Sequence, residues 1–255
     1  MLERLNLDFS FYDWLLVIIV TIFGTISAYI KDPQLKAVTG TVPIPFGFAY
    51  IAIGHPIGAA NAGGALLCLL FVHVVRILTY KMHVPIVLSI LAGIIAFIVP
   101  SAILLPIMPQ GECFFFLICA VNLILGIFLF KTQTYHKGIQ YKTPLPVYIK
   151  APAVAAVVAG LMLIKKIVGG FATSFPMMNS IVSYESRHSL GDQCRQLPLF
   201  LIAAPFMFVW MHYSETRFSW NHWFVLVTGV TLYMIIFIPL NQKLRKKIEA
   251  AAKEL

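Results

Sequence analysis

Two short segments, TGTVPIPFGFAYIAIG (residues 39–54) and GGFATSFPMMNSIVSY (residues 169–184), place glycine and proline inside otherwise apolar stretches. Proline has no backbone N–H, and its ring clashes with the preceding helical turn, so we expect neither segment to form one continuous helix. The breaks are predicted at residues 40–46 and 170–176. Each helix that restarts after a break would begin with free N–H groups and a partial positive charge.

The chain around these segments has the composition of an integral membrane protein. Of its 255 residues, 60% are hydrophobic and 11% are charged, and the mean hydropathy is +0.87. Soluble domains carry about 45–50% apolar and about 25% charged residues, which excludes a soluble globular enzyme. The net charge of +9 does not indicate a nucleic-acid partner, because Lys and Arg in membrane proteins collect on the cytoplasmic side. The apolar runs lie near residues 13–30, 38–54, 58–80, 83–107, 112–131, 147–165, 168–184, 196–213 and 219–240.

The basic residues indicate how many of these runs cross the membrane. If all nine cross, 15 of the 19 Lys and Arg residues lie on one side. If the two broken segments are hairpins that return to the same side, the division is 11 to 8. The positive-inside rule favours nine crossings, with the N-terminus outside and the C-terminus in the cytoplasm. We expect a multi-pass protein of the bacterial inner membrane with a basic cytoplasmic tail.

The order of elements predicts an all-α protein with a 4+1+4 inverted repeat. Each half has an opening helix, a broken segment and two long apolar helices, so the second and seventh helices are the broken ones. Five crossings separate equivalent helices, and an odd number places the halves in opposite directions through the membrane. The predicted units are a first four-helix repeat (1–107), a linker helix with a cytoplasmic loop (108–146), an inverted second repeat (147–240) and a tail (241–255). The alternative is a coincidence of two proline-containing helices, which are common in membranes.

Paired, interrupted segments in the two halves of a transporter indicate its substrate site. The two restarted helices would face each other near mid-membrane, where a pair of positive helix ends attracts an anion or a carbonyl-rich solute. The spacing matches as well, since Gly40 precedes Pro45–Phe46 as Gly170 precedes Phe175–Pro176. The predicted substrate-binding residues are Gly40, Pro45, Phe46, Gly170, Thr173, Ser174, Phe175, Pro176 and Asn179.

A charged stretch, YESRHSLGDQCRQ (184–196), follows the second broken segment on the predicted cytoplasmic side. It is either an ordinary charged loop or a cytoplasmic gate, in which a carboxylate and a histidine exchange protons. Its counterpart on the outer side, GHPIGAANAGG (54–64), carries a histidine, and its small residues also suit close helix packing. The predicted gating or proton-coupling residues are His55, Tyr184, Glu185, Arg187, His188, Asp192 and Arg195.

The sequence lacks the motifs of several enzyme and pump classes. H-E-x-x-H, G-x-S-x-G and the phosphate-binding G-x-x-x-x-G-K-[ST] are missing, so we expect neither an enzyme nor a nucleotide-driven pump. The four cysteines have no zinc-site spacing, and we expect no metal and no cofactor. The expected partners are the lipid bilayer, a small solute and, as one option, further copies of the chain in a homo-oligomer.

The second half of the chain resembles the GlpM family of small four-helix bacterial inner-membrane proteins. The resemblance is carried by YIKAPAVAAVV (148–158), a glycine-led stretch that reaches Phe175–Pro176, and Tyr184. It departs after Tyr184, where this chain continues ESRHSLGDQCRQ. The resemblance implies a four-helix unit in a bacterial inner membrane and no particular substrate, and the whole chain would be a duplicated, inverted version of that unit.

These observations favour one function over another. The leading interpretation is a membrane transporter, secondary and in one version proton-coupled, or a channel for a small polar or anionic solute. The solute would bind near mid-membrane between the two broken helices. The alternative is a non-transporting inner-membrane scaffold or assembly factor for envelope or polymer export.

Overall fold

The computed structural model describes residues 11–54, 56–109, 111–134, 138–165, 171–218 and 220–251. The regular elements of these residues are helices, with no strand among them. The α-helices are α1 (Phe11–Tyr29), α2 (Pro33–Thr39), α3 (Ile44–Ile53), α4 (Ala59–Tyr80), α5 (Ile86–Leu104), α6 (Glu112–Thr132), α7 (Val147–Lys165), α8 (Met177–Glu185), α9 (Leu190–Phe218) and α10 (His222–Ala251).

Long apolar helices confirm the prediction of an all-helical, multi-pass membrane protein. Seven helical segments of the described residues are long and apolar enough to cross a bilayer: α1, the stretch Pro33–Ala52 that contains α2 and most of α3, α4, α5, α6, α9 and α10. The apolar part of α7, Val147–Leu163, is shorter, and α8 has nine residues. The two remaining predicted crossings would therefore have to come from α7 and from the segment that contains α8.

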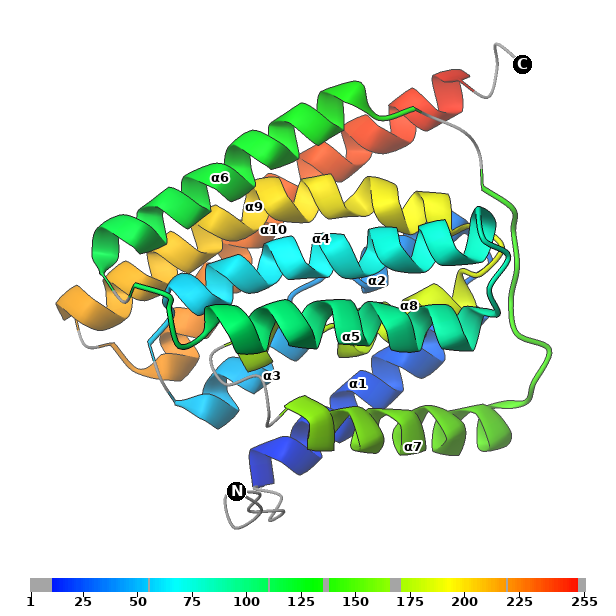
Figure 1. Ribbon diagram of the computed structural model, residues 1–255, viewed down its shortest axis with the longest axis horizontal. Helices are drawn as coiled ribbons and strands as arrows, with labels where there is room; N and C mark the ends of the chain where they lie inside the picture. Colours follow the sequence, from blue (N-terminus) through cyan, green and yellow to red (C-terminus); the bar gives the residue numbers. More distant parts are fainter. Residues whose placement is uncertain are drawn as a thin grey trace.

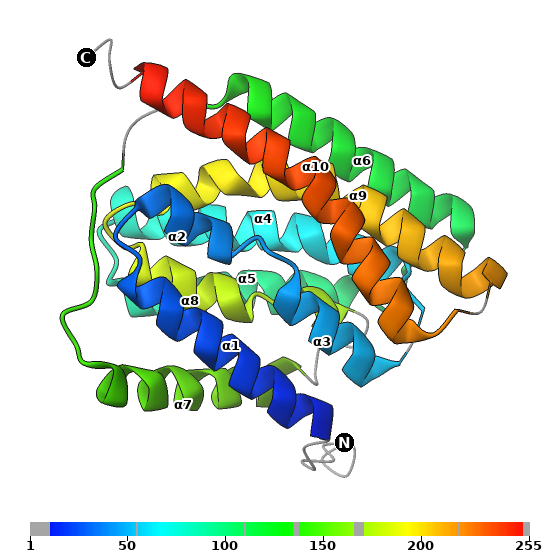
Figure 2. The same cartoon turned by 180° about the vertical axis from the view of Figure 1, so that it is seen from behind.

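The helices form one bundle in which most axes run roughly along its long dimension (Figure 1). We call one end the basic end: α1, α4, α6, α8 and α10 finish there, and α2, α5, α7 and α9 start there. The connection 138–146 lies at this end (Figure 1). At the opposite end α3, α5, α7 and α9 finish, and α1, α4, α6 and α10 start (Figure 2). Consecutive helices thus alternate in direction, apart from the interrupted stretches.

The first interruption lies between α2 and α3 and is shorter than predicted. Asp32 caps α2, because its Oδ1 accepts from the amides of Gln34 (2.8 Å) and Leu35 (3.3 Å). Residues 40–43 are outside helices, and α3 begins at Ile44, two residues before the predicted restart. The reason is that proline fits the first helical turn, where its missing N–H costs nothing, so Pro45 lies inside α3.

The second interruption precedes α8. Residues 171–174 form a 3₁₀ turn within the stretch predicted to be non-helical, and α8 begins at Met177, one residue after the predicted restart. Pro176 is the N-cap of α8, with φ −79° and ψ 44°, and Pro43 is the N-cap of α3, with φ −81° and ψ 30°. The backbone angles of Pro43 thus match those of Pro176. An alignment of the two segments on this pair differs by three residues from the alignment that pairs Gly40 with Gly170.

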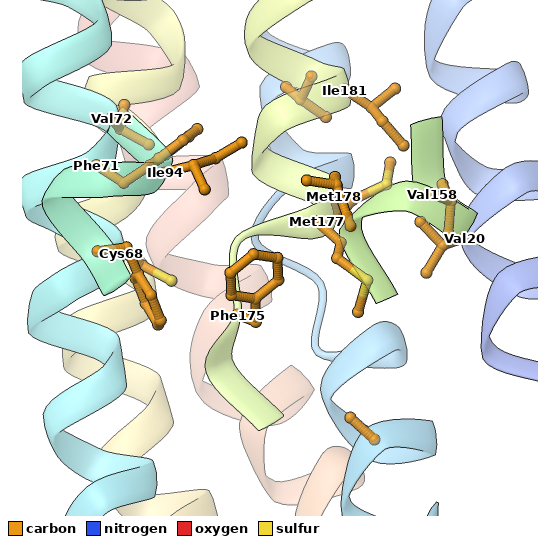
Figure 3. Close-up of a cluster of buried hydrophobic side chains, with 14 of the residues drawn as sticks. Val20, Cys68, Phe71, Val72, Ile94, Val158, Phe175, Met177, Met178 and Ile181 are labelled. Atoms are coloured by element: carbon orange, nitrogen blue, oxygen red, sulfur yellow. The ribbon is translucent and has the colours of Figure 1, made fainter. Parts of the chain in front are cut away.

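The second interruption is surrounded by side chains from four helices. Phe175 and Met177 lie between Cys68 of α4 on one side and Val158 of α7 on the other (Figure 3). The ring of Phe175 meets that of Phe97 edge-on, with 5.6 Å between centroids. A second core cluster joins α3, α6, α9 and α10. The two interruptions therefore lie inside the bundle, where irregular backbone in a membrane protein has to be.

Candidate functional site

A small cavity separates the two interruptions and has a volume of about 50 Å³. Eight of the nine predicted substrate-binding residues line it; the ninth, Gly170, lies outside the described residues. The eight are Gly40, Pro45, Phe46, Thr173, Ser174, Phe175, Pro176 and Asn179. Sequence reasoning missed the remaining lining residues, which are Thr41, Val42, Pro43, Cys68, Met177, Met178, Leu197 and Phe200.

The first interruption packs closely against α8 at Gly40. A Cβ atom placed on Gly40 would lie 2.9 Å from Oδ1 of Asn179 and 3.5 Å from Cγ2 of Val182, both on α8. The backbone of Gly40 has φ −79° and ψ −16°, which any residue adopts. Glycine is therefore needed here for the close approach of the two segments rather than for its backbone conformation.

Backbone amides at the start of both helices have no acceptor among the described residues. In α3 these are the amides of Ile44 and Phe46, since the first bond to the turn before the helix comes from Gly47 to Pro43 O (3.0 Å). In α8 they are the amides of Met178 and Asn179. Phe46, Met178 and Asn179 are cavity-lining residues. Two positive helix ends thus meet at one cavity, an arrangement that favours an anion or a partially negative group.

Side chains around the cavity hold the second interruption against α4. Asn61 Nδ2 donates to Thr173 Oγ1 (2.8 Å), and Ser174 Oγ donates back to the Asn61 carbonyl (3.0 Å). Cys68 Sγ lies 3.0 Å from the Ser174 carbonyl. These hydroxyls therefore have protein partners, and they position the turn.

The first interruption and α8 are held in the same way by α10 and α9. Tyr233 donates its hydroxyl to the carbonyl of Thr41 (2.8 Å). Gln193 Nε2 donates to the Asn179 carbonyl (3.1 Å), while Ser183 Oγ donates to Gln193 Oε1 (2.9 Å). Helix α10 thus fixes the first interruption, and α9 fixes the start of α8.

A buried ionic cluster closes the bundle at the basic end. Glu185, 1% exposed, forms a salt bridge with Lys150. Lys36, 2% exposed, donates from Nζ to the Glu185 carbonyl (3.1 Å) and to the Tyr141 carbonyl (2.7 Å). Arg187 donates to the Tyr141 hydroxyl, and its guanidinium lies 4.5 Å from the centroid of that ring. Lys36, Lys150 and Tyr141 come from distant parts of the chain, and the sequence carried no signal that they meet Glu185.

The structure places the predicted gating residues in different surroundings. Tyr184, Glu185 and Arg187 belong to the buried cluster, since the Tyr184 ring stacks under Arg187 at 5.1 Å. Asp192 and Arg195 pair with each other instead (2.9 Å), and Arg195 Nε donates to the Thr134 carbonyl. His188 is exposed and lies 4.9 Å from the Tyr141 ring, while His55 lies outside the described residues.

A second polar cluster, which the sequence analysis did not single out, lies at the opposite end. Glu215 accepts a hydrogen bond from the Tyr50 hydroxyl, and its Oε1 is 2.9 Å from Nδ1 of His222. Its Oε2 accepts from the amide of Ile57 (3.1 Å), whose carbonyl lies 2.6 Å from Nδ1 of His212. This cluster ties α3 and the start of α4 to α9 and α10.

Comparison with known proteins adds no assignment: no family model matches the chain, and neither a curated protein nor a solved structure matches it. The described residues contain no group of three His, Cys, Asp or Glu that could hold a metal ion.

Proposed function

We propose that the protein is a membrane transporter for a small anion, or for a small polar solute that presents a negative oxygen. The observation that carries the proposal is the pair of helix starts at one cavity. Phe46 on one side, and Met178 and Asn179 on the other, line the cavity, and their amides have no backbone acceptor among the described residues. Buried N–H groups without a partner cost free energy, and a bound anion or ordered water supplies that partner.

The size of the cavity limits the solute. A water molecule needs about 10–15 Å³ of such a cavity, so 50 Å³ holds only a few waters or one small anion. Chloride, nitrate and formate are of this size class. Sugars and nucleotides are far larger and would need the two interruptions to move apart.

The packing supports an inverted repeat as the framework of this transporter. We infer that α1 to α5 correspond to α7 to α10, with α2 and α3 corresponding to the 3₁₀ turn and α8. The equivalent helices run in opposite directions (Figures 1 and 2). Under this correspondence contacts appear in matching pairs: α4 packs on α5 as α9 packs on α10, and α5 meets α8 as α10 meets α3. The self-related pairs α1–α7 and α4–α9 are also in contact.

The two polar clusters are the proposed gates. The Glu185 cluster and the connection 138–146 cover the basic end, where Thr143 N also donates to the Ala28 carbonyl (3.1 Å). The Glu215 cluster joins four segments at the opposite end. Alternating access would open one cluster at a time while the central cavity keeps the solute. The resemblance to the GlpM family, the bacterial inner membrane and a cytoplasmic basic end belong to the same proposal.

Flux measurement tests the function directly. Purified protein in liposomes would be assayed for release of chloride, nitrate and formate, with protein-free liposomes as the control. We expect saturable release of at least one of the three anions when an added potassium carrier provides electrical balance. In protein-containing liposomes without the carrier, we expect no release of potassium. A folded, correctly inserted protein that releases no tested anion would contradict the proposal and favour the scaffold alternative.

A further inference from the structure

A second, larger hollow lies on the side of the bundle, between α5, α7 and α8. Its volume is about 560 Å³, within the range of pockets that bind drug-sized molecules. The wall is mainly aliphatic and includes Leu91, Ile94 and Leu161. Polar groups are confined to one end, where Lys150, Tyr184 and Glu185 line it. In Figure 1, α7 lies at the edge of the bundle.

The dimensions of the groove match one leaflet of a bilayer. Lys150 and Leu161 mark its extent along α7, and eleven residues of helix rise about 16 Å. Half of the hydrocarbon core is about 15 Å thick. Val87, Leu91 and Val157, at the rim, are each about half exposed, so the groove opens sideways toward lipid. Its polar end lies at the basic end of the bundle, near the level of lipid headgroups.

Positive charge exceeds negative charge at the polar end. Three cations, Lys36, Lys150 and Arg187, gather around Glu185, the one carboxylate in contact with them in the described part of the chain. The remaining nearby acid, Asp192, is paired with Arg195. Carbonyls at the end of α8 offset part of the excess. An anion at the mouth of the groove would compensate the rest, and basic pockets between membrane helices bind anionic headgroups in this way.

We propose that this groove binds one anionic phospholipid, with an acyl chain along α5 and α7 and the phosphate beside Lys150. The site is separate from the central cavity, since α8 lies between them and contributes different residues to each. The proposal stands whether or not the protein transports an anion.

Filling the groove tests the acyl-chain part of the proposal. A Cβ atom at Gly160, a groove residue, would meet no atom within 4 Å, so Gly160→Phe adds a ring to the groove without a clash at its base. Leu163→Phe is the matched control, because Leu163 is exposed on the same helix and is not part of the groove wall. Native mass spectrometry with added phosphatidylglycerol should show one tightly held lipid in the parent and in the control, and at least a five-fold loss in Gly160→Phe. Equal retention by Gly160→Phe and the parent would overturn the proposal.

Removing the charge pair tests the headgroup part. The double variant Lys150→Gln with Glu185→Gln removes one charge of each sign together, so the net charge of the cluster stays the same and a change in lipid preference reports the Lys150 ammonium group. The parent should prefer phosphatidylglycerol to phosphatidylcholine by about five-fold, the factor that one lysine near a membrane surface contributes. The double variant should bind the two lipids equally. A parent that binds both lipids equally, or a double variant that keeps the full preference, would show that Lys150 does not recognise the phosphate.

Discussion

Substituting Gly40 by alanine probes the contact between the first interruption and α8 with a single methyl group. The backbone of Gly40 is right-handed helical, so alanine introduces no conformational strain. The added Cβ would lie 2.9 Å from Asn179 Oδ1, which is closer than carbon and oxygen normally approach, and 3.4 Å from the Ala37 carbonyl. The variant must therefore push the start of α8 away or turn the Asn179 side chain, which disturbs its contact with Gln193.

The magnitude follows from two opposing contributions. Overpacking a well-filled interior costs about 1–3 kcal/mol. Replacing glycine where the backbone conformation suits alanine returns about 0.4–1 kcal/mol by reducing the entropy of the unfolded chain. We expect the free energy of unfolding to fall by about 0.5–2 kcal/mol. For a chain of this size, each kcal/mol lowers the melting temperature by about 2–4 °C.

Thermal unfolding of the purified protein and anion release from liposomes are the two readouts. Gly40→Ala should melt several degrees lower and lose most of its flux, because the cavity wall has moved. Gly160→Ala is the control, since open space surrounds that position and alanine favours helix there. Adding Asn179→Ala to Gly40→Ala removes the clashing atom, so the double variant should be more stable than the sum of the two changes predicts. Parent-like melting and flux in Gly40→Ala, or strict additivity, would refute the contact between the first interruption and α8.

Three further predictions concern the ends of the bundle. Glu185→Gln should lower the free energy of unfolding by about 3–5 kcal/mol, because it leaves Lys150 buried without its counter-ion. The double variant Lys150→Met with Glu185→Leu should recover most of this loss in a thermal melt. A cysteine at Lys142, which is exposed in the connection at the basic end, should react with an impermeant thiol reagent only from the cytoplasmic side of oriented vesicles; labelling from the outside would invert the proposed topology. In a chain whose other three cysteines are serine, Glu215→Gln should weaken the opposite gate and increase the thiol labelling of Cys68, at the cavity, by at least several-fold. Unchanged labelling would argue against a gate there.

Local chemistry explains how much of the fold the sequence predicted. The helix content and membrane character follow from composition and from long apolar runs, and the structure agrees with them. The positions at which helices stop near Thr39 and start near Met177 follow from the properties of glycine and proline at those positions. The spacing from Gly40 and Gly170 and the matching backbone conformations of Pro43 and Pro176 give registers that differ by three residues, because both Pro43 and Pro45 offered a helix start.

The sequence pattern could not predict which residues tertiary packing brings together. Cys68 and Phe200 reach the central cavity from long, regular helices whose patterns mark no such position. Lys36 lies in a short polar connection of the sequence, yet it is buried beside the Glu185 carbonyl. Glu215 is a single acid near a helix end, a common pattern, and its three partners come from different elements.

The two proposed gates differ chemically. The basic end is held by a buried salt bridge and by cations over the Tyr141 and Tyr184 rings, interactions whose strength depends on low local dielectric. The opposite end is held by hydrogen bonds to Glu215, and the side chain of His222 is about half exposed there. Water entry would therefore weaken the basic-end cluster more steeply than the Glu215 cluster. Two gates of unequal strength would give the two proposed open states different free energies. A substitution at either end should then shift the balance between these states rather than abolish both.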